Sequence, residues 1–144
     1  MLVKIYELGE IEDNKLEFAA ISALYMNKYV FVKHKKRETW EIPGGRREKG
    51  ETICETGKRE LQEETGAEEF EIEEICDYSV TIADKTTYGR LFYSNIYKLG
   101  ELPDLEIGEV ELFDSVPNKL TYPKIQPLLQ KKAIEMCNKL KLKE

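Results

Sequence analysis

The chain has 144 residues, of which 41% are hydrophobic and 35% are charged, and its formal net charge is −6. This length fits one domain with one core, so we expect a single domain over residues 1–144. No stretch approaches about 18 apolar residues, and charged residues interrupt the N-terminus too early for a signal peptide. These features argue against a membrane protein and predict a cytoplasmic one.

Few side chains offer thiol or imidazole chemistry. Cys54, Cys76 and Cys137 are odd in number and far apart, which predicts reduced thiols and argues against a disulfide framework or a zinc site. His34 is the single histidine, so no histidine cluster can bind zinc, and a Ser-His-Asp triad would depend on this one ring. Its basic, polar neighbours predict an exposed hairpin histidine, with a substrate contact as the alternative. Carboxylates and a metal ion remain as the catalytic groups.

Alternating apolar residues and β-branched residues predict six strands and two helices. The strands are expected at residues 2–8, 17–26, 28–34, 70–82, 88–98 and 108–114. Local sequence signals mark both ends of the first helix. Thr52 and Glu55 have the spacing of a capping box, and Gly66 can adopt the left-handed conformation that ends a helix. About thirteen helical residues should lie between them, with Ile53 and Leu61 facing inward.

The second helix begins at Pro123 or Gln126 and runs to about Leu140. Its apolar stripe comprises Ile125, Leu128, Leu129, Ala133, Ile134 and Cys137. Strands lie before the first helix and between the first helix and this last one. This order predicts an α/β fold with a mixed β-sheet between helices.

Three glutamates share one face of the first helix: Glu60, Glu63 and Glu64. They occupy positions i, i+3 and i+4, so their carboxylates converge. Their mutual repulsion weakens the helix unless a hard cation binds them, which predicts a site for Mg2+ or Mn2+. Arg59 lies one turn after Glu55. We expect an ion pair from Arg59 to Glu55 or Glu51 to hold Arg59 away from the metal face and to orient the acidic cluster.

The same segment carries a longer pattern, in which a Gly, five residues, a Glu and seven residues precede Arg-Glu-aliphatic-any-Glu-Glu-any-Gly-aliphatic. Its members are Gly45, Glu51, Arg59, Glu60, Leu61, Glu63, Glu64, Gly66 and Ala67. In this pattern, and in the approach from Trp40 to Gly45, the chain resembles the Nudix hydrolases. The resemblance implies an α/β/α sandwich with a mixed sheet, a signature loop and helix, and a C-terminal helix. It also implies hydrolysis of a phosphoanhydride with Mg2+ or Mn2+.

The resemblance further implies roles for individual residues. The implied metal ligands are the carbonyl of Gly44, Glu60, Glu63, Glu64 and one later acid, for which Glu106 is the first choice and Glu109 the second. Glu63 or Glu60 would take the proton of the attacking water, beside Arg59. Lys35 is the first choice for a phosphate contact, although a solvated basic turn is an equal alternative. Arg46 and Arg47 follow, and Gly45 allows close approach of the backbone.

The net charge of −6 would repel an anionic substrate, and bound cations resolve that conflict. The short chain is similar to the MutT-like branch, which implies cleavage of a nucleoside triphosphate to monophosphate and pyrophosphate, 8-oxo-dGTP included. The enzyme after which that branch is named reads the oxidised guanine with an asparagine at the start of its last helix, whereas the nearest position here is Ile125. Residues that could stack on a base are Tyr6, Tyr25, Tyr78 and Tyr88.

Two alternatives stay open. The first is a Nudix pyrophosphohydrolase acting on RNA 5′-triphosphate ends or on a nucleotide sugar, and the second is a non-catalytic nucleotide-binding module. The expected partner is a nucleotide, with nucleic acid only as an RNA 5′ end, no membrane partner, and a monomeric or homodimeric state.

Overall fold

The computed structural model describes the backbone of residues 1–142 and side chains as far as residue 136, so Cys137 lies outside the described side chains. The elements, in chain order, are β1 (Leu2–Tyr6), a 3-10 helix (Asp13–Lys15), β2 (Leu16–Tyr25), β3 (Lys28–His34), β4 (Gly44–Arg46), α1 (Ile53–Thr65), β5 (Ala67–Ile82), β6 (Lys85–Leu99), β7 (Ile107–Phe113) and α2 (Gln126–Leu142). No helix within residues 1–142 is long and apolar enough to cross a membrane.

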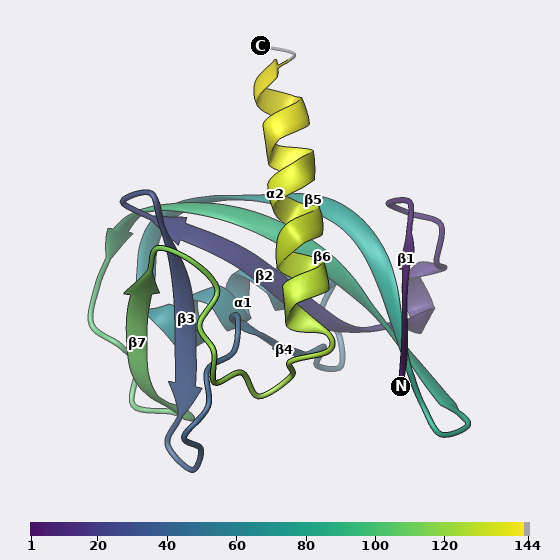
Figure 1. Cartoon of the computed structure of the whole chain (residues 1–144), viewed down its shortest axis with the longest axis horizontal. Helices are drawn as coiled ribbons and strands as arrows, with labels where there is room; N and C mark the ends of the chain where they lie inside the picture. The colour runs from purple at the N-terminus through teal and green to yellow at the C-terminus, as the bar shows by residue number, and fades with distance from the viewer. Residues whose placement is uncertain (143–144) are drawn as a thin grey trace.

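The strands form one sheet in the order β1-β5-β6-β2-β3-β7, and β4 pairs with β2. Strands β2 and β6 run parallel, whereas the other strand pairs of the described chain are antiparallel. The predicted mixed sheet is therefore confirmed. Figure 1 shows α2 on the near face of this sheet and α1 on the far face, which is the expected α/β/α arrangement.

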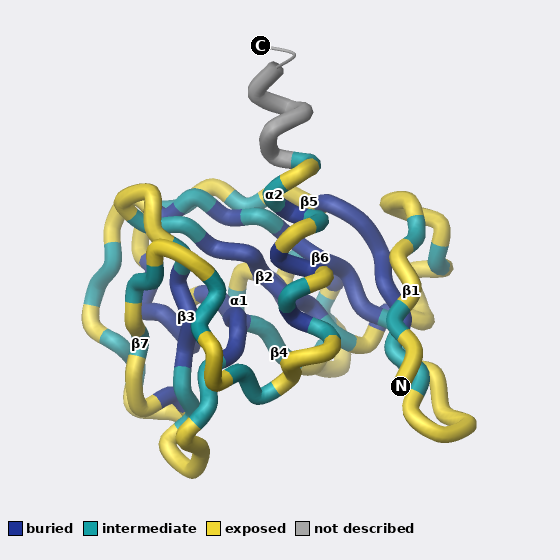
Figure 2. The backbone as a smooth tube through the Cα atoms, viewed as in Figure 1, coloured by how far each residue is buried: buried dark blue, intermediate teal, exposed yellow. Residues whose placement is uncertain are grey.

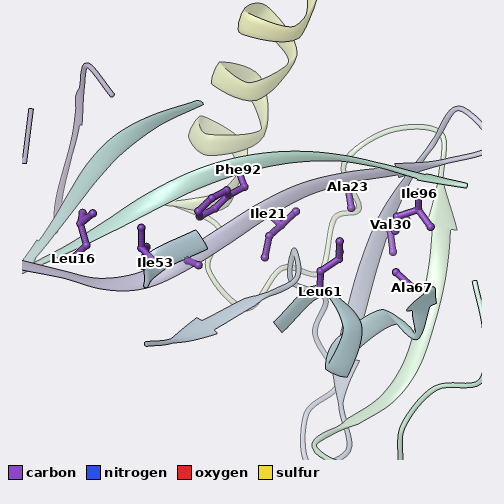
Figure 3. Close-up of a cluster of buried hydrophobic side chains, with 10 residues drawn as sticks. Leu16, Ile21, Ala23, Val30, Ile53, Leu61, Ala67, Phe92 and Ile96 are labelled. Carbon is purple, nitrogen blue, oxygen red and sulfur yellow. The ribbon is translucent and has the colours of Figure 1, made fainter. Parts of the chain in front are cut away.

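Each face of the sheet has its own apolar core. On the α1 side, Ile53 and Leu61 point from the helix toward Ile21 and Phe92 of the sheet (Figure 3). The helix lies close to the sheet because Gly57 has no side chain: a Cβ there would stand 3.3 Å from the ring of Phe92. This packing confirms the predicted inward face of the first helix.

On the α2 side, Leu129 and Ala133 pack against Phe31 and Leu91. Leu128, expected in the apolar stripe, is half exposed, because it lies about 100° around the helix from the buried Leu129. Figure 2 shows the middle of the sheet buried and strand β1 largely exposed at its edge. The signature helix is thus held firmly on one face while α2 covers part of the other.

The boundaries of α1 follow the predicted signals. The hydroxyl of Thr52 accepts a hydrogen bond from the backbone N–H of Glu55 at 3.1 Å, and the backbone N–H of Thr52 donates to the Glu55 carboxylate at 3.0 Å. At the other end Gly66 has φ 78°, a left-handed conformation, and its N–H bonds the carbonyl of Gln62. Strand β5 begins directly after this glycine, three residues earlier than expected.

The capping box yields a stability prediction. Thr52→Ala removes the hydroxyl acceptor, so the free energy of unfolding should fall by about 1 kcal/mol. Thr52→Ser keeps the acceptor and should retain most of that stability. Urea unfolding followed by circular dichroism measures both variants. Equal stability of the alanine variant and the wild type would show that this cap does not stabilise α1.

Candidate active site

A cavity of about 650 Å³ opens beside α1 and crosses from its face of the sheet to that of α2. Two of the three clustered glutamates line it. Glu64 is buried, with 6% of its side chain exposed, and Glu60 is also largely buried. Glu63 does not line the cavity and is 40% exposed beside Arg59. The predicted cluster therefore divides into two cavity carboxylates and one at the surface.

Burial raises the pKa of both cavity carboxyls. The pKa of Glu64 rises to about 8, because burial disfavours the charged form and neighbouring carboxylates add to this, while the N–H of Gly44 opposes it. The pKa of Glu60 rises to about 7, again mainly through burial, although Arg59 opposes the shift. Such carboxylates lack a full counter-charge, so their chemistry suits a bound cation.

The glycines of β4 allow this close packing of helix and backbone. The N–H of Gly44 donates to Oε1 of Glu64 at 2.9 Å. A Cβ on Gly44 would lie 2.4 Å from the carbonyl oxygen of Ala19, and a Cβ on Gly45 would lie 2.5 Å from the carboxyl of Glu60. The contact at Gly44 is with backbone, so only glycine fits there, whereas a side chain on Gly45 would force the carboxyl of Glu60 to move. The backbone of β4 can thus approach the carboxylates of α1.

Arg59 forms the predicted ion pair with Glu51, through Nε at 2.6 Å, and this pair lowers the pKa of Glu51 to about 2. The expectation that Arg59 stays away from the metal face is wrong. Its Nη1 donates to Glu60 at 2.8 Å and to Glu63 at 3.1 Å. Arg59 precedes Glu60 directly and Glu63 by one turn, so one guanidinium reaches both. Glu55 is engaged by the helix cap instead.

His34 is not the exposed hairpin residue that its neighbours predict. Only 22% of its side chain is exposed, and its Nε2 lies 2.7 Å from Oε1 of Glu41 and 3.8 Å from Oε2 of Glu64. Its Nδ1 lies 4.0 Å from Oε2 of Glu106. Strand alternation could have indicated this position, because His34 is on the same face of β3 as Val30, which packs in the core beneath α1.

Two further residues that line the cavity, Glu41 and Arg37, were not predicted as site residues. Glu41 is buried although it is charged, and it accepts a hydrogen bond from Nη1 of Arg37 at 3.1 Å. Both side chains line the cavity. No pattern in the sequence marks Glu41, because its burial depends on the bridge between Glu41 and Val32 of β3.

The remaining predicted residues lie in different places. Glu106 lines the cavity from the loop before β7 and is 81% exposed, whereas Glu109 lies opposite Lys33 in the sheet and does not line it. Lys35 pairs with Asp104 at the surface and does not line the cavity. Glu106 and Glu64 are therefore brought together, and Lys35 is not.

The two arginines of the signature loop also differ. Arg46 lines the cavity, with its guanidinium 5.0 Å from the ring centre of Phe18. Arg47 lines it too but is held by the carbonyl of Glu51 at 2.8 Å and the carboxylate of Asp13 at 3.1 Å. Arg47 thus stabilises the loop, while Arg46 contacts a ring and forms no ion pair with a carboxylate among residues 1–136.

The rest of the cavity is mostly apolar. Its lining includes Phe18, Tyr78, Val80, Ile125 and Leu129. Gln126, the first residue of α2, adds an amide whose Oε1 accepts the N–H of Ile42 at 2.9 Å. Tyr78 is the one predicted stacking tyrosine in this lining, and it is buried against Gly89, where a Cβ would lie 2.5 Å from its ring. Acidic and apolar surfaces thus share one cavity.

Comparisons with known proteins agree with this geometry. The NUDIX domain family model matches residues 15–117. A protein of Bacillus subtilis (strain 168) named "Putative 8-oxo-dGTP diphosphatase YtkD" is 30% identical over 118 residues, which are 81% of this chain and 74% of that protein.

Solved structures share the fold. The Bacillus subtilis pyrophosphohydrolase BsRppH matches with a TM-score of 0.78 and 22% identity, covering 92% of this chain and 90% of that one. The NUDIX domain of Shewanella oneidensis NrtR, complexed with ADP ribose, matches with a TM-score of 0.66 and 16% identity, covering 84% of this chain and 87% of that one. Since the family match spans more than half of the chain and includes the whole glutamate-bearing helix, this protein belongs to the Nudix hydrolase family.

Proposed function

We propose that this chain is a Mg2+- or Mn2+-dependent nucleoside triphosphate diphosphatase that releases pyrophosphate, and that 8-oxo-dGTP is among its substrates. The observation that carries the proposal is one cavity that joins buried carboxylates to an apolar wall. Its volume of about 650 Å³ suits a nucleotide-sized ligand. The name of the Bacillus subtilis relative supports the same substrate.

The residues present fit a hard cation. Glu60 and Glu64 offer carboxylate oxygens in a buried setting that disfavours their charged form and raises their pKa values. We propose that they hold the cation together with Glu63, Glu106 and the carbonyl of Gly44. When bound, such a cation neutralises phosphate oxygens and activates a water molecule.

The chain's own residues would then position the substrate and move one proton. Glu63 or Glu60 would accept the proton of the attacking water. Arg59 fixes both carboxylates through its guanidinium. For the phosphates we propose Arg46 and the backbone at Gly45, and Arg37 joins this set because it lines the cavity, whereas Lys35 pairs with Asp104 outside it.

The apolar wall would bind the base. The rings and aliphatic side chains of Phe18 and Ile125 offer a surface for stacking and packing. Because the N–H of Ile42 occupies Oε1 of Gln126, the amide nitrogen is left to donate to a carbonyl of the base. Gln126 directly follows Ile125, which is the position nearest to the guanine-reading asparagine of the enzyme that gives the MutT-like branch its name. A guanine carbonyl is therefore our proposed partner for this amide.

A second candidate substrate is an RNA 5′-triphosphate end. A more open depression of about 660 Å³ adjoins the cavity and shares Arg46 and Arg47 with it; Lys49 also lines it, together with the acidic residues Asp13, Glu17, Glu48 and Glu51. The fold likeness to a pyrophosphohydrolase is in keeping with this reading. A third candidate, a nucleotide sugar, has a fold relative called UDP-X diphosphatase, with a TM-score of 0.72, 20% identity, and coverage of 86% of this chain and 63% of that one.

A binding module without catalysis is the remaining alternative, since a NUDIX domain is known in complex with ADP ribose. The combination of Glu60, Glu63 and Glu64 with Arg59 argues against it, because binding alone does not require this set.

The first test compares substrates. Purified protein with Mg2+ or Mn2+ should release pyrophosphate from 8-oxo-dGTP, and more slowly from canonical triphosphates. Triphosphorylated RNA, UDP-sugars and ADP-ribose complete the panel. Glu60→Gln and Glu63→Gln should each reduce turnover by about a hundredfold or more, because each change removes a carboxylate charge.

Glu69→Gln is the matched control, since Glu69 is exposed on β5 and does not line the cavity. It should retain wild-type turnover. No pyrophosphate release from any triphosphate would refute the proposal, and near-normal turnover of both catalytic variants would refute the roles of Glu60 and Glu63.

The second test uses pH. The pKa of Glu64 is about 8 in the folded chain, against an ordinary value of 4.5. Between these values the folded state keeps a proton that the unfolded chain has lost, so metal-free protein should lose stability as pH rises. One such proton corresponds to about 1.4 kcal/mol per pH unit.

Urea unfolding in a chelator between pH 5 and 8 measures this slope. Glu64→Gln should reduce this slope and leave the part that Glu60 contributes below pH 7, Glu69→Gln should not change it, and saturating Mg2+ should restore stability at pH 8 because the ion binds the charged form. A slope in Glu64→Gln equal to that of the wild type would contradict the account of a buried, proton-bearing carboxyl.

A further inference from the structure

The single imidazole of the chain lies among the carboxylates of the cavity. One donor atom from each of His34, Glu64 and Glu106 can be chosen so that all lie within 4.8 Å of one another. Two ligands that share an ion at about 2.1 Å each can stand up to about 4.2 Å apart. Nδ1 of His34 lies 4.0 Å from Oε2 of Glu106, which is within this limit, whereas the 3.8 Å separation from Oε2 of Glu64 is measured from Nε2. Glu106 is exposed on its loop, so its side chain can shift until the three donor atoms, now within 4.8 Å of one another, are close enough to share an ion.

The ring of His34 is oriented as metal-binding histidines are. Its Nε2 lies 2.7 Å from the carboxylate of Glu41, so Nε2–H donates to Glu41 in the neutral ring. Glu41 is itself buried and fixed by Arg37. The lone pair of the ring then remains on Nδ1, which is the nitrogen nearest to Glu106. A carboxylate that accepts the other ring N–H fixes the tautomer and raises the basicity of the ligand nitrogen.

We infer that Nδ1 of His34 is a nitrogen ligand of the cation site and that Glu41 is its positioning residue. The inference deepens the proposed function, since both use the same cavity. Mg2+ prefers oxygen ligands, whereas imidazole binds Co2+ and Mn2+ more readily. A site that combines Glu64, Glu106 and an imidazole therefore selects Co2+ and Mn2+ over Mg2+.

The competing arrangement is an imidazolium that pairs with the surrounding carboxylates. In that case both ring nitrogens carry protons, and neither can bind a metal. The two arrangements predict opposite results for nitrogen coupling to a bound paramagnetic ion.

The direct test is pulsed electron paramagnetic resonance of the full chain loaded with Mn2+ and prepared without a histidine tag. Because the sequence contains one histidine, 15N-histidine labelling changes the nitrogen coupling of this ring alone. We expect an imidazole coupling in the wild type that shifts on labelling and is lost in His34→Gln. Absence of the coupling in the wild type would overturn the inference, even if the variant failed to fold.

Calorimetric titration with Co2+ and Mg2+ provides the second readout. The ratio of Mg2+ to Co2+ dissociation constants should fall at least tenfold in His34→Gln. Glu41→Gln should weaken Co2+ binding while the nitrogen coupling persists, because it removes the carboxylate that orients the ring. Glu111→Gln, an exposed change on β7, is the control and should preserve the ratio. An unchanged ratio in His34→Gln would overturn the inference.

The two proposals fail separately. Active enzyme without histidine coupling would refute only the nitrogen ligand. A protein that shows the coupling and hydrolyses no nucleotide would refute only the proposed activity.

Discussion

This structure depends on one constraint: α1 is fixed on the sheet in an orientation that buries carboxylates. Ile53 and Leu61 anchor α1 to the sheet, and Glu60 and Glu64 lie on the same side of the helix, so their carboxylates must face inward to the cavity. Burying a carboxylate is costly unless it is paired and hydrogen-bonded. The N–H of Gly44 donates a hydrogen bond to Glu64, and the guanidinium of Arg59 partly neutralises the charge of Glu60. A bound cation would turn the remaining cost into binding affinity.

The same constraint explains the glycines before the helix. A side chain on Gly45 would displace the carboxyl of Glu60, and a side chain on Gly44 would collide with the backbone of β2. The strand, the loop and the helix therefore form one unit whose residues cannot be exchanged independently. Arg59 ties the parts together, since it contacts Glu51, the carbonyl of Arg46 and two glutamates of the helix.

Elements with local signals were predictable from the sequence. The ends of α1 follow from Thr52 and Gly66, and the long strands follow from alternation, because these signals act within a few residues. Strand β4 was not predicted as a strand of its own. It has three residues, two of them glycines, so it shows no alternation, and it forms only because it pairs with β2. His34 was misjudged because its charged neighbours suggested solvent. Glu41 was missed because its burial arises from residues distant in sequence.

The two faces of the sheet divide the proposed work. The α1 face supplies carboxylates within a motif shared by the family, whereas the α2 face supplies Ile125, Gln126 and an apolar wall that lie outside that motif. Chemistry is thus readable from the pattern, and substrate choice depends on residues whose roles emerge only when the chain is folded.

The most direct measurement of the central claim is anomalous X-ray scattering from crystals of this protein soaked with Mn2+. The account predicts a manganese peak at coordination distance from carboxylate oxygens of Glu60 and Glu64, with Arg59 displaced from Glu60. Crystals that show no manganese in the cavity, with Arg59 still bound to Glu60, would contradict it.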